Sequence, residues 1–457
     1  MFFNFIQHKI YLRATGYTGK RVVRHLASKH PNLNIGICGR NKVKLQAVGK
    51  DIGWDEEKCT SSIFVVADIV ENASELVAAF SKAKVLLACS GPYRNCGIPI
   101  LKAAIEAKCD YLDLCGEPQF FDDALVAFDR KARDAGVLAV HAAAFDCVPA
   151  ELGANLAERE LLKRYSNENN SQCAGIEIIH TMQNVSSANA TTFHAAVDGF
   201  YAASSGELKA SRKKVKDSFP EFGQTKPPKR PENWPKILDT PGIMPGYNDE
   251  LNLRTMKFVG ADASAIRSSW RYLRSRSTNH PRKGTAVAEP RLSVLIGIDG
   301  SDSTTALKVM AYGGMFSTLA RFQFGCNLLH SYPETFSNGV FTSKGPTEDE
   351  LKEGSFTTYV TAYGSNHTDA NPQLARVKVS GPEPGYVATP RLIVALALAI
   401  LDDGKKEGNE VNLSFEGGCT LPGALFCDSD KVYKNMRNEG VSFDVVNQFI
   451  TDDQSPV

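Results

Sequence analysis

A glycine-rich turn near the start of the chain has the residue types that hold the pyrophosphate of a dinucleotide. The stretch "RATGYTG" (Arg13–Gly19) follows the spacing G-x-x-G-x-x-G, in which Gly16 and Gly19 occupy the second and third glycine positions. In such a turn the phosphates approach backbone N–H groups that open a helix, where the helix dipole adds partial positive charge. We therefore expect the phosphate site at Thr15, Gly16, Tyr17, Thr18 and Gly19.

Arg13 occupies the position of the first glycine in that spacing. A side chain there crowds a turn that favours glycine, although its charge suits a pyrophosphate. The preceding "QHKIYL" (Gln7–Leu12) is also unusual, because it puts polar residues into the strand expected at the centre of a sheet. Our interpretation is that Met1–Arg13 is an alternative or mispredicted beginning joined to an otherwise ordinary domain. With Arg13 in the mature protein, we expect weakened cofactor binding.

The end of the second predicted strand indicates which dinucleotide binds. A carboxylate at this point usually accepts the ribose hydroxyls of NAD, whereas an arginine pairs with the 2′-phosphate of NADP. Arg40 stands here, in "ICGRNKVK". NADP is therefore the expected cofactor and NAD the alternative, with Arg40 as a plain surface residue in the second case. Asp68 closes the third strand, either at the adenine edge or as the N-terminal carboxylate of a helix.

Ligands of an open parallel sheet lie beyond the carboxyl ends of its strands. The turn "SGPY" leaves the fourth predicted strand at this edge. We expect Ser90, Gly91 and Tyr93 to line the phosphates and the nicotinamide ribose of the cofactor. The alternative is a plain Gly-Pro turn.

Three carboxylates follow the later strands and are candidates for acid–base catalysis. Asp113 and Glu117 flank the end of the fifth strand, and Asp146 follows the sixth. Burial would raise the pKa of such a group towards the range of a general acid or base. Each alone fits a helix cap or a turn better, so we assign no catalytic residue. His141 is expected to be a packed core residue, and no metal site is expected because no His-Cys cluster has zinc-ligand spacing.

Short apolar runs alternate with helical patterns from Thr15 to Ala150. Alternation of this kind, with helices of 10–16 residues, predicts βαβ units and a parallel sheet. The strands of such a sheet are buried on both faces, which agrees with their continuous apolar character. The second to sixth predicted strands are Asn32–Cys38, Ser62–Asp68, Val85–Gly91, Tyr111–Glu117 and Val137–Ala143.

The pattern changes after Pro149. Ile176–Gln183 is predicted as a strand and Thr191–Ser205 as a helix. The segment Glu207–Lys236 is basic and rich in proline; we expect a long solvated loop, with an anionic membrane surface as the alternative partner. Val309–Leu329 is semi-apolar, and we expect a pair of core helices there, with a lipid-contacting surface as the alternative.

The apolar run "LIVALALAIL" (Leu392–Leu401) predicts a buried helix, since it is shorter than the ~18 apolar residues that span a bilayer. A helix this apolar must be covered by something large, and the sheet of the first domain is the natural candidate. The predicted domains are therefore residues 1–150, which bind the dinucleotide, residues 151–380, which bind substrate or lipid and contain the basic loop 207–236, and residues 381–457, which return to the first domain.

Four blocks of the sequence resemble the saccharopine dehydrogenase-like oxidoreductases. They run from Ala14 almost to the C-terminus, and Arg13 is the one departure from the family's pattern. The resemblance implies an α/β fold with a Rossmann-type doubly wound parallel sheet, a second mixed α/β domain and a C-terminal segment that returns to the first. Relatives include enzymes that act on carbon–nitrogen bonds of amino acids, enoyl reductases of glycolipid synthesis, and animal proteins associated with lipid droplets and membranes. The blocks are "ATGYTGKRVVRHLA" with "ICGRNKVKL", "SGPYRNCGIPILKAAIEAKCDYLDLCGEPQF", "AAFDCVPAELGA", and "FTSKGPTEDELKEGSF" with "VSGPEPGYVATP".

Bulk composition sets the class of protein. The 457 residues, 43% hydrophobic and 23% charged, fit a globular protein with two or three folded units. A net charge of +1 without a basic aromatic patch predicts no nucleic-acid partner. Eleven cysteines without C-x-x-C spacing indicate reduced thiols in a cytosol-facing protein that is not secreted. A lipid droplet, a mitochondrion or a membrane surface is the expected site of any association.

The predicted function is an NAD(P)-dependent oxidoreductase that acts on a small-molecule or lipid-linked substrate in lipid or glycolipid metabolism. The alternative is a catalytically weak or inactive Rossmann shell that docks peripherally on lipid droplets or membranes. A homo-oligomer is compatible with either prediction.

Overall fold

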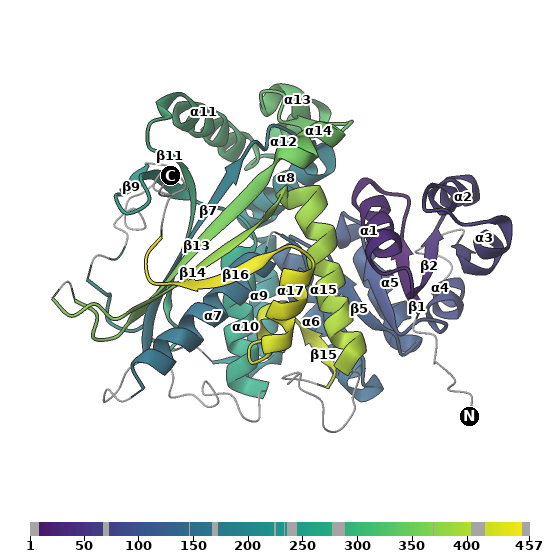
Figure 1. Ribbon diagram of the computed structural model, residues 1–457, viewed down its shortest axis with the longest axis horizontal. Helices are drawn as coiled ribbons and strands as arrows, with labels where there is room; N and C mark the ends of the chain where they lie inside the picture. The colour runs from purple at the N-terminus through teal and green to yellow at the C-terminus, as the bar shows by residue number, and fades with distance from the viewer. Residues whose placement is uncertain are drawn as a thin grey trace. The chain divides into compact units, whose positions relative to one another are not determined.

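The chain forms two units, which a computed structural model describes over residues 9–66, 73–145, 147–166, 172–223, 225–232, 234, 245–276, 288–368, 370–403 and 416–449. The first unit consists of residues 1–145 and 385–440. The second consists of residues 146–384 and 441–457. Figure 1 shows the elements of each unit with their labels.

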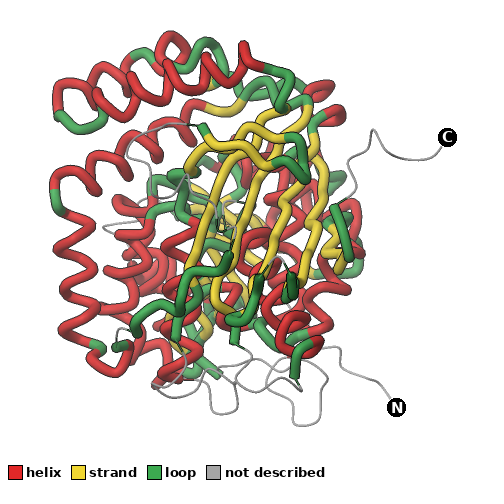
Figure 2. The backbone as a smooth tube through the Cα atoms, turned by 90° about the vertical axis from the view of Figure 1, so that its left-hand side faces the viewer, coloured by secondary structure: helices red, strands yellow, loops and turns green. Residues whose placement is uncertain are grey.

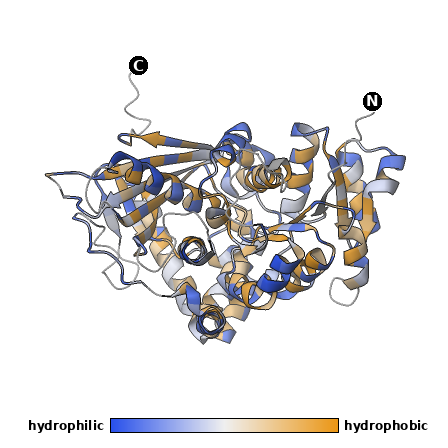
Figure 3. Ribbon diagram, turned by 90° about the horizontal axis from the view of Figure 1, so that it is seen from below, coloured by the Kyte–Doolittle hydropathy of each residue, from blue (hydrophilic) through white to orange (hydrophobic). Residues whose placement is uncertain are grey.

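The first unit is built around a parallel sheet of seven strands in the order β15-β6-β5-β4-β1-β2-β3. Each of its neighbouring pairs is parallel. The strands are mostly hydrophobic, because helices cover both faces of a doubly wound sheet. Figure 3 shows the residues coloured by hydropathy. The predicted Rossmann-type fold is confirmed. The strands are β1 (Lys9–Arg13), β2 (Asn34–Gly39), β3 (Ile63–Val65), β4 (Val85–Ala88), β5 (Asp110–Asp113), β6 (Leu138–Val140) and β15 (Gly418–Thr420).

Helices alternate with these strands, and their ends follow local sequence rules. The helix α1 (Tyr17–Lys29) buries Val22, Val23 and Leu26 along one face. The helix α6 (Pro118–Ala135) begins with proline, which suits the first helical position, and ends at Gly136 in the left-handed conformation. The other helices of this part are α2 (Lys42–Asp51), α3 (Glu56–Ser62), α4 (Ala73–Phe80) and α5 (Tyr93–Glu106).

Residues 385–440 complete the first unit. The strand β15 pairs in parallel with β6 and extends the sheet at that edge. The helix α15 (Thr389–Asp403) packs against α1, against β4 and against α17 (Asp430–Asn438) (Figure 1). The short helix α16 (Pro422–Leu425) follows β15 in the chain and precedes α17. Segments from the two ends of the chain therefore share one core.

One helix among the described residues, Pro384–Leu401, is long and apolar enough to cross a membrane, with a mean hydropathy of 1.6 over 18 residues. This differs from the sequence prediction, because a π-helical turn at Pro384–Ala388 runs directly into α15 and lengthens the apolar stretch. Side chains from Leu392 to Ala397 are fully buried. As predicted, the run Leu392–Leu401 is a buried helix.

The second unit contains a mixed sheet in the order β16-β14-β13-β7-β11-β10-β9. Only β11 and β7 are parallel neighbours within this described sheet, and its long central strands lie side by side in Figure 2. The helix α7 (Val148–Arg164) packs closely on β13 and β14, because Gly153 leaves no β-carbon between it and Val360 or Val379. The strands are β7 (Cys173–Gln183), β9 (Gly246–Asn248), β10 (Leu253–Lys257), β11 (Arg291–Asp299), β13 (Ser355–Gly364), β14 (Leu374–Pro382) and β16 (Ser442–Val446).

Helices make up most of the rest of the second unit among the described residues. The pair β8 (Ala188–Asn189) and β12 (Phe341–Thr342) forms a small separate sheet, and Pro220–Phe222 is a 3₁₀ turn. The helices are α8 (Ala190–Ser205), α9 (Glu207–Ser218), α10 (Asp262–Arg276), α11 (Ser303–Leu319), α12 (Gln323–Ser331), α13 (Pro333–Phe336) and α14 (Glu348–Glu353).

Two predictions for this unit differ from the structure. The segment expected as a loop over Glu207–Lys236 begins with the regular helix α9, because its Glu, Ala, Arg and Lys residues favour helix and Val215 faces inward. The segment Val309–Leu329 forms a helix pair, but α11 is not a core helix, since only Ala306 of its side chains is buried. Apolar content alone does not show whether another element covers a helix.

Candidate cofactor site

The turn between β1 and α1 leaves the start of α1 open to an anion. Gly16 precedes the helix in extended conformation, no side chain caps the helix, and its first turn contains no acidic residue. Backbone N–H groups and the helix dipole there favour a bound phosphate. A β-carbon built on Gly16 would lie 3.9 Å from the carbonyl oxygen of Cys89, which places this turn beside the end of β4.

Tyr17 connects this turn to the C-terminal part of the first unit. Its ring lies edge-on to Tyr386 with the centroids 4.8 Å apart. The guanidinium of Arg21 sits over the Tyr17 ring at 4.8 Å and donates a hydrogen bond to the Tyr17 hydroxyl at 3.1 Å. Tyr386 belongs to the "GPEPGYVATP" block. Tyr386 was not predicted to be near the phosphate turn, because its distance from Tyr17 along the chain leaves no local pattern in the sequence.

A small pocket of about 30 Å³ opens where β2, β3 and β4 end. Arg40 lies at its margin with an exposed side chain. The Ser90 hydroxyl oxygen is buried and has no hydrogen-bond partner among the described residues. Asp68, the other residue predicted near this edge, lies outside the described residues. The lining consists of Cys38, Gly39, Arg40, Val66, Leu76, Phe80, Leu86, Ala88, Ser90 and Ile100.

Tyr93 is buried and ties two strand ends together. Its hydroxyl donates to the Ala88 carbonyl oxygen at 2.6 Å and accepts from the Leu114 N–H at 3.0 Å. Burial raises the pKa of the Tyr93 hydroxyl well above its usual value. Gly91 precedes a cis peptide bond to Pro92. Neither Gly91 nor Tyr93 is among the pocket-lining residues, whereas Ser90 is.

Glu117 caps the start of α5. Its carboxylate accepts hydrogen bonds from the N–H groups of Tyr93 at 2.8 Å and Arg94 at 3.2 Å, and from the Arg94 Nε at 3.2 Å. A carboxylate is well placed at the positive end of a helix. This geometry corresponds to the helix-cap alternative that the sequence left open for Glu117.

Asp113 and His141 form a buried pair at the carboxyl ends of β5 and β6. His141 Nδ1 lies 2.7 Å from one Asp113 oxygen, and the other oxygen accepts from the N–H groups of Cys115 and Ala142. The His141 Nε2 has no partner in the described part of the chain, and the rings of Phe120 and Tyr111 enclose the imidazole. An Asp bound to Nδ1 orients an imidazole and fixes its tautomer. Asp146 lies outside the described residues.

Residues 14–140 match the family model "Saccharopine dehydrogenase NADP binding domain", beginning at the residue after Arg13. A saccharopine dehydrogenase-like oxidoreductase from Rattus norvegicus is 30% identical over 95% of this chain and 96% of its own length.

The chain belongs to the saccharopine dehydrogenase-like oxidoreductase family.

Two further similarities extend the comparison. A "Lipid droplet localized protein" from Caenorhabditis elegans is 27% identical over 95% of this chain and 97% of its own length. Apo saccharopine dehydrogenase (L-Glu forming) from Saccharomyces cerevisiae superposes with a TM-score of 0.53 at 12% identity, over 96% of this chain and all of that one. The second likeness supports the fold alone.

NADP is the cofactor of this domain, as the sequence predicted. The residues present in this member of the saccharopine dehydrogenase-like family fit a dinucleotide. Gly16 keeps the phosphate turn free of a side chain, and the uncapped start of α1 supplies N–H donors. The unpartnered Ser90 hydroxyl offers a further hydrogen bond beside the turn.

Proposed function

We propose that the protein is an NADP-dependent oxidoreductase of small-molecule or lipid-linked substrates. The observation that carries the proposal is the uncapped, acid-free start of α1 beside a pocket with Arg40 at its margin and the unpartnered Ser90 hydroxyl in its wall. The N–H groups of Thr15–Gly19 bind the pyrophosphate, and Arg40 pairs with the 2′-phosphate. Bound NADP supplies or accepts the hydride.

The chain's own residues orient groups and hold protons in this proposal. Asp113 keeps a proton at the Nδ1 of His141, so that the Nε2 can accept one. Glu117 fixes the start of α5 after the "SGPY" turn, and Tyr93 links the ends of β4 and β5. These contacts join neighbouring elements at the carboxyl edge of the sheet, where hydride transfer requires orientation and electrostatics from the protein.

Titration of the full chain with NADPH and with NADH tests the proposal. A ligand at 100 times its Kd should stabilise the protein by ~2.7 kcal/mol, which a thermal melt detects. We expect a larger shift with NADPH than with NADH. No shift with either nucleotide, in the native chain and in an Arg13→Gly variant, would remove the enzyme proposal. A shift that appears only in Arg13→Gly would identify a site narrowed by the arginine.

A second function, docking on a lipid surface, is favoured by exposed apolar side chains on α11, on α12 and just before α12. Leu307, Phe322 and Phe324 have 67%, 63% and 78% of their surfaces exposed. Single exposed apolar residues are ordinary, but grouped aromatic ones mark contact surfaces. The name of the Caenorhabditis elegans relative is consistent with such docking. Flotation with lipid vesicles tests it, and protein that stays in the dense, lipid-free fraction argues against it.

A further inference from the structure

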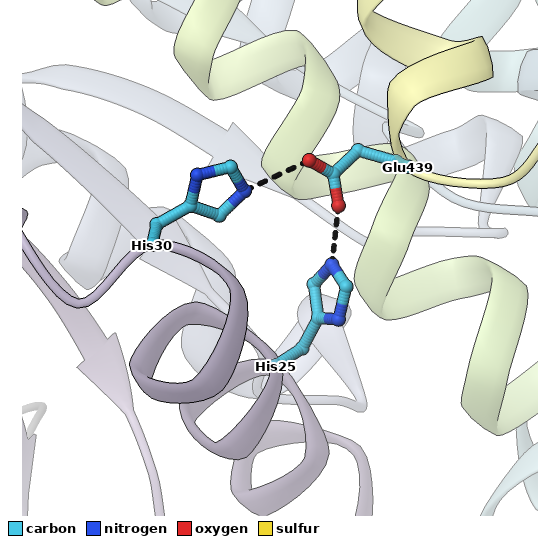
Figure 4. Close-up of side chains that lie close together, drawn as sticks. All are labelled: His25, His30 and Glu439. Carbon is cyan, nitrogen blue, oxygen red and sulfur yellow. Dashed lines mark hydrogen bonds and ion pairs between the residues drawn. The ribbon is translucent and has the colours of Figure 1, made fainter.

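Two histidines and one glutamate of the first unit point their side chains at one another (Figure 4). The Nε2 of His25 lies 2.5 Å from one carboxylate oxygen of Glu439, and the Nε2 of His30 lies 2.8 Å from the other. The potential ligand atoms of the three residues all lie within 4.8 Å of one another. This was not expected from the sequence, where Glu439 is 409 positions beyond His30.

The three side chains come from firmly packed elements. His25 lies on α1, and His30 ends that helix in a non-helical conformation that turns its ring back towards His25. Glu439 ends α17. Both helices pack on α15, whose side chains from Leu392 to Ala397 are fully buried. The cluster is therefore held by helices that share a core rather than by mobile loops.

We propose that His25, His30 and Glu439 form a Zn²⁺ site of the His₂Glu type with one open coordination position. Two imidazole nitrogens and a carboxylate oxygen are ligands that Zn²⁺ prefers, at 2.0–2.2 Å each, and catalytic zinc sites use three such protein ligands plus water. An ion at these bond lengths needs donor atoms roughly 3–4 Å apart, which small side-chain adjustments from the present spacing supply.

The charge of the cluster favours a cation. The Glu439 side chain is 2% exposed. Arg391 donates to the backbone oxygen of Glu439 at 3.2 Å, and no described contact brings it to the carboxylate. A buried carboxylate needs a positive partner, which is either a protonated histidine or a metal ion.

The site is reachable from solvent. The side chains of His25 and His30 are 18% and 22% exposed, so an ion can enter on the histidine side and keep a water ligand there. When the ion binds, it takes the Nε2 lone pairs, and each imidazole carries its remaining proton on Nδ1. Bound Zn²⁺ then links α1, which begins at the phosphate turn, to the end of residues 385–440.

Zinc binding by the full chain tests the proposal. Metal is first removed with a chelator, the thiols are kept reduced, and the protein is dialysed against Zn²⁺ before the metal content is measured. We expect the wild type to bind one zinc ion. In His30→Gln and in Glu439→Gln the affinity for zinc should fall at least ~10-fold, because replacing even a residue that only hydrogen-bonds to a zinc ligand weakens metal binding by that factor. His194→Gln, which removes an imidazole from the second unit, should retain the ion.

The change in Tm on adding Zn²⁺ separates a metal site from a metal-free ion pair. We expect a rise on the order of 3 °C in the wild type and none in either site variant. The contrary outcome has two parts: zinc does not raise the Tm of the wild type, and both site variants have a lower Tm than the wild type with and without zinc. This outcome would show an ion pair only and would overturn the proposal. Replacing Zn²⁺ by Co²⁺ should give visible d–d absorption without a thiolate charge-transfer band. Such a band would assign the metal to cysteine instead and would also overturn it.

Discussion

At the scale of single residues, buried carboxylates differ in what compensates their charge. Asp113 and Glu117 each accept two backbone N–H groups as well as a side-chain contact. Glu177 on β7 accepts a hydrogen bond from the Tyr363 hydroxyl at 2.8 Å. Burial raises the pKa of Glu177 to about 7, although the Tyr363 bond acts to lower it. Its charged form is therefore the costly one.

The Glu177 pKa predicts that stability falls as pH rises. The folded-state value of about 7 exceeds the ordinary value of 4.5, so the folded protein binds more protons between these two pH values. Protonated Glu177 therefore contributes about 3 kcal/mol to the free energy of unfolding. The contribution is fully present below pH 4.5 and is lost as pH rises through 7. Glu177→Gln should remove that slope and melt higher than the wild type above pH 7. Thermal melts across pH measure it, with the exposed Glu353→Gln as control; an unchanged slope in Glu177→Gln would contradict the assignment.

Arg40 carries the predicted choice of NADP over NAD. A charged hydrogen-bonded contact contributes about 1.5–3 kcal/mol, so Arg40→Ala should weaken NADPH binding by about 10- to 100-fold. NADH binding should change little, because NADH lacks the 2′-phosphate. Fluorescence titration with both nucleotides measures this, and Lys42→Ala is the matched control. Equal losses for both nucleotides would mean that Arg40 does not contact the 2′-phosphate.

The sequence could predict the parts of the site that depend on local patterns, but not the contacts between residues far apart in the chain. The choice of NADP followed from one arginine after one strand, and the family match confirms the cofactor. The residue roles at Thr15–Gly19, Arg40 and Ser90 stay predictions. The contact of Tyr17 with Tyr386 and the cluster at Glu439 join residues hundreds of positions apart, so no local spacing could indicate them.

At the scale of elements, α11 and α12 show why apolar content misleads. The α12 side chains Cys326 and Leu329 join a core with Phe193 and Val197 of α8. The connection before α12 and the helix's outer face leave Phe322 and Phe324 exposed. Apolar content predicted a pair of core helices here but overstated the burial of α11, because burial depends on which element packs against each face.

The exposed aromatic pair predicts where a lipid surface would bind. Burying one phenylalanine side chain contributes about 1.5–3 kcal/mol, so the double variant Phe322→Ser/Phe324→Ser should reduce vesicle binding at least ~10-fold. NADPH binding should stay unchanged. Vesicle flotation measures the first and the thermal shift the second. Val43→Ser, which removes an equally exposed apolar residue from α2, is the control; equal losses in the control would mean that the contact is not specific to this segment.

At the scale of the whole molecule, continuous apolar runs were enough to predict the parallel sheet of the first unit. The apolar run at Leu392–Leu401 was also enough to predict that a late segment needs cover. The edge strand β15 was not predicted, since its three residues have no strand-length pattern of their own. Its pairing with β6 joins two strands that residues 146–384 of the second unit separate along the chain.

Shared packing predicts that NADPH stabilises residues 385–440 together with residues 1–145. Tyr386 contacts Tyr17 and α15 packs on α1, so these segments should open together when the first unit unfolds. A ligand at 100 times its Kd slows exchange through that opening by up to about 100-fold. Hydrogen-exchange mass spectrometry should therefore show slower exchange in α1 and in α15 by similar factors, with NADH as the weaker control. Protection of α1 without α15 would show that the C-terminal segment opens independently, because a ligand can slow only those openings that destroy its own site.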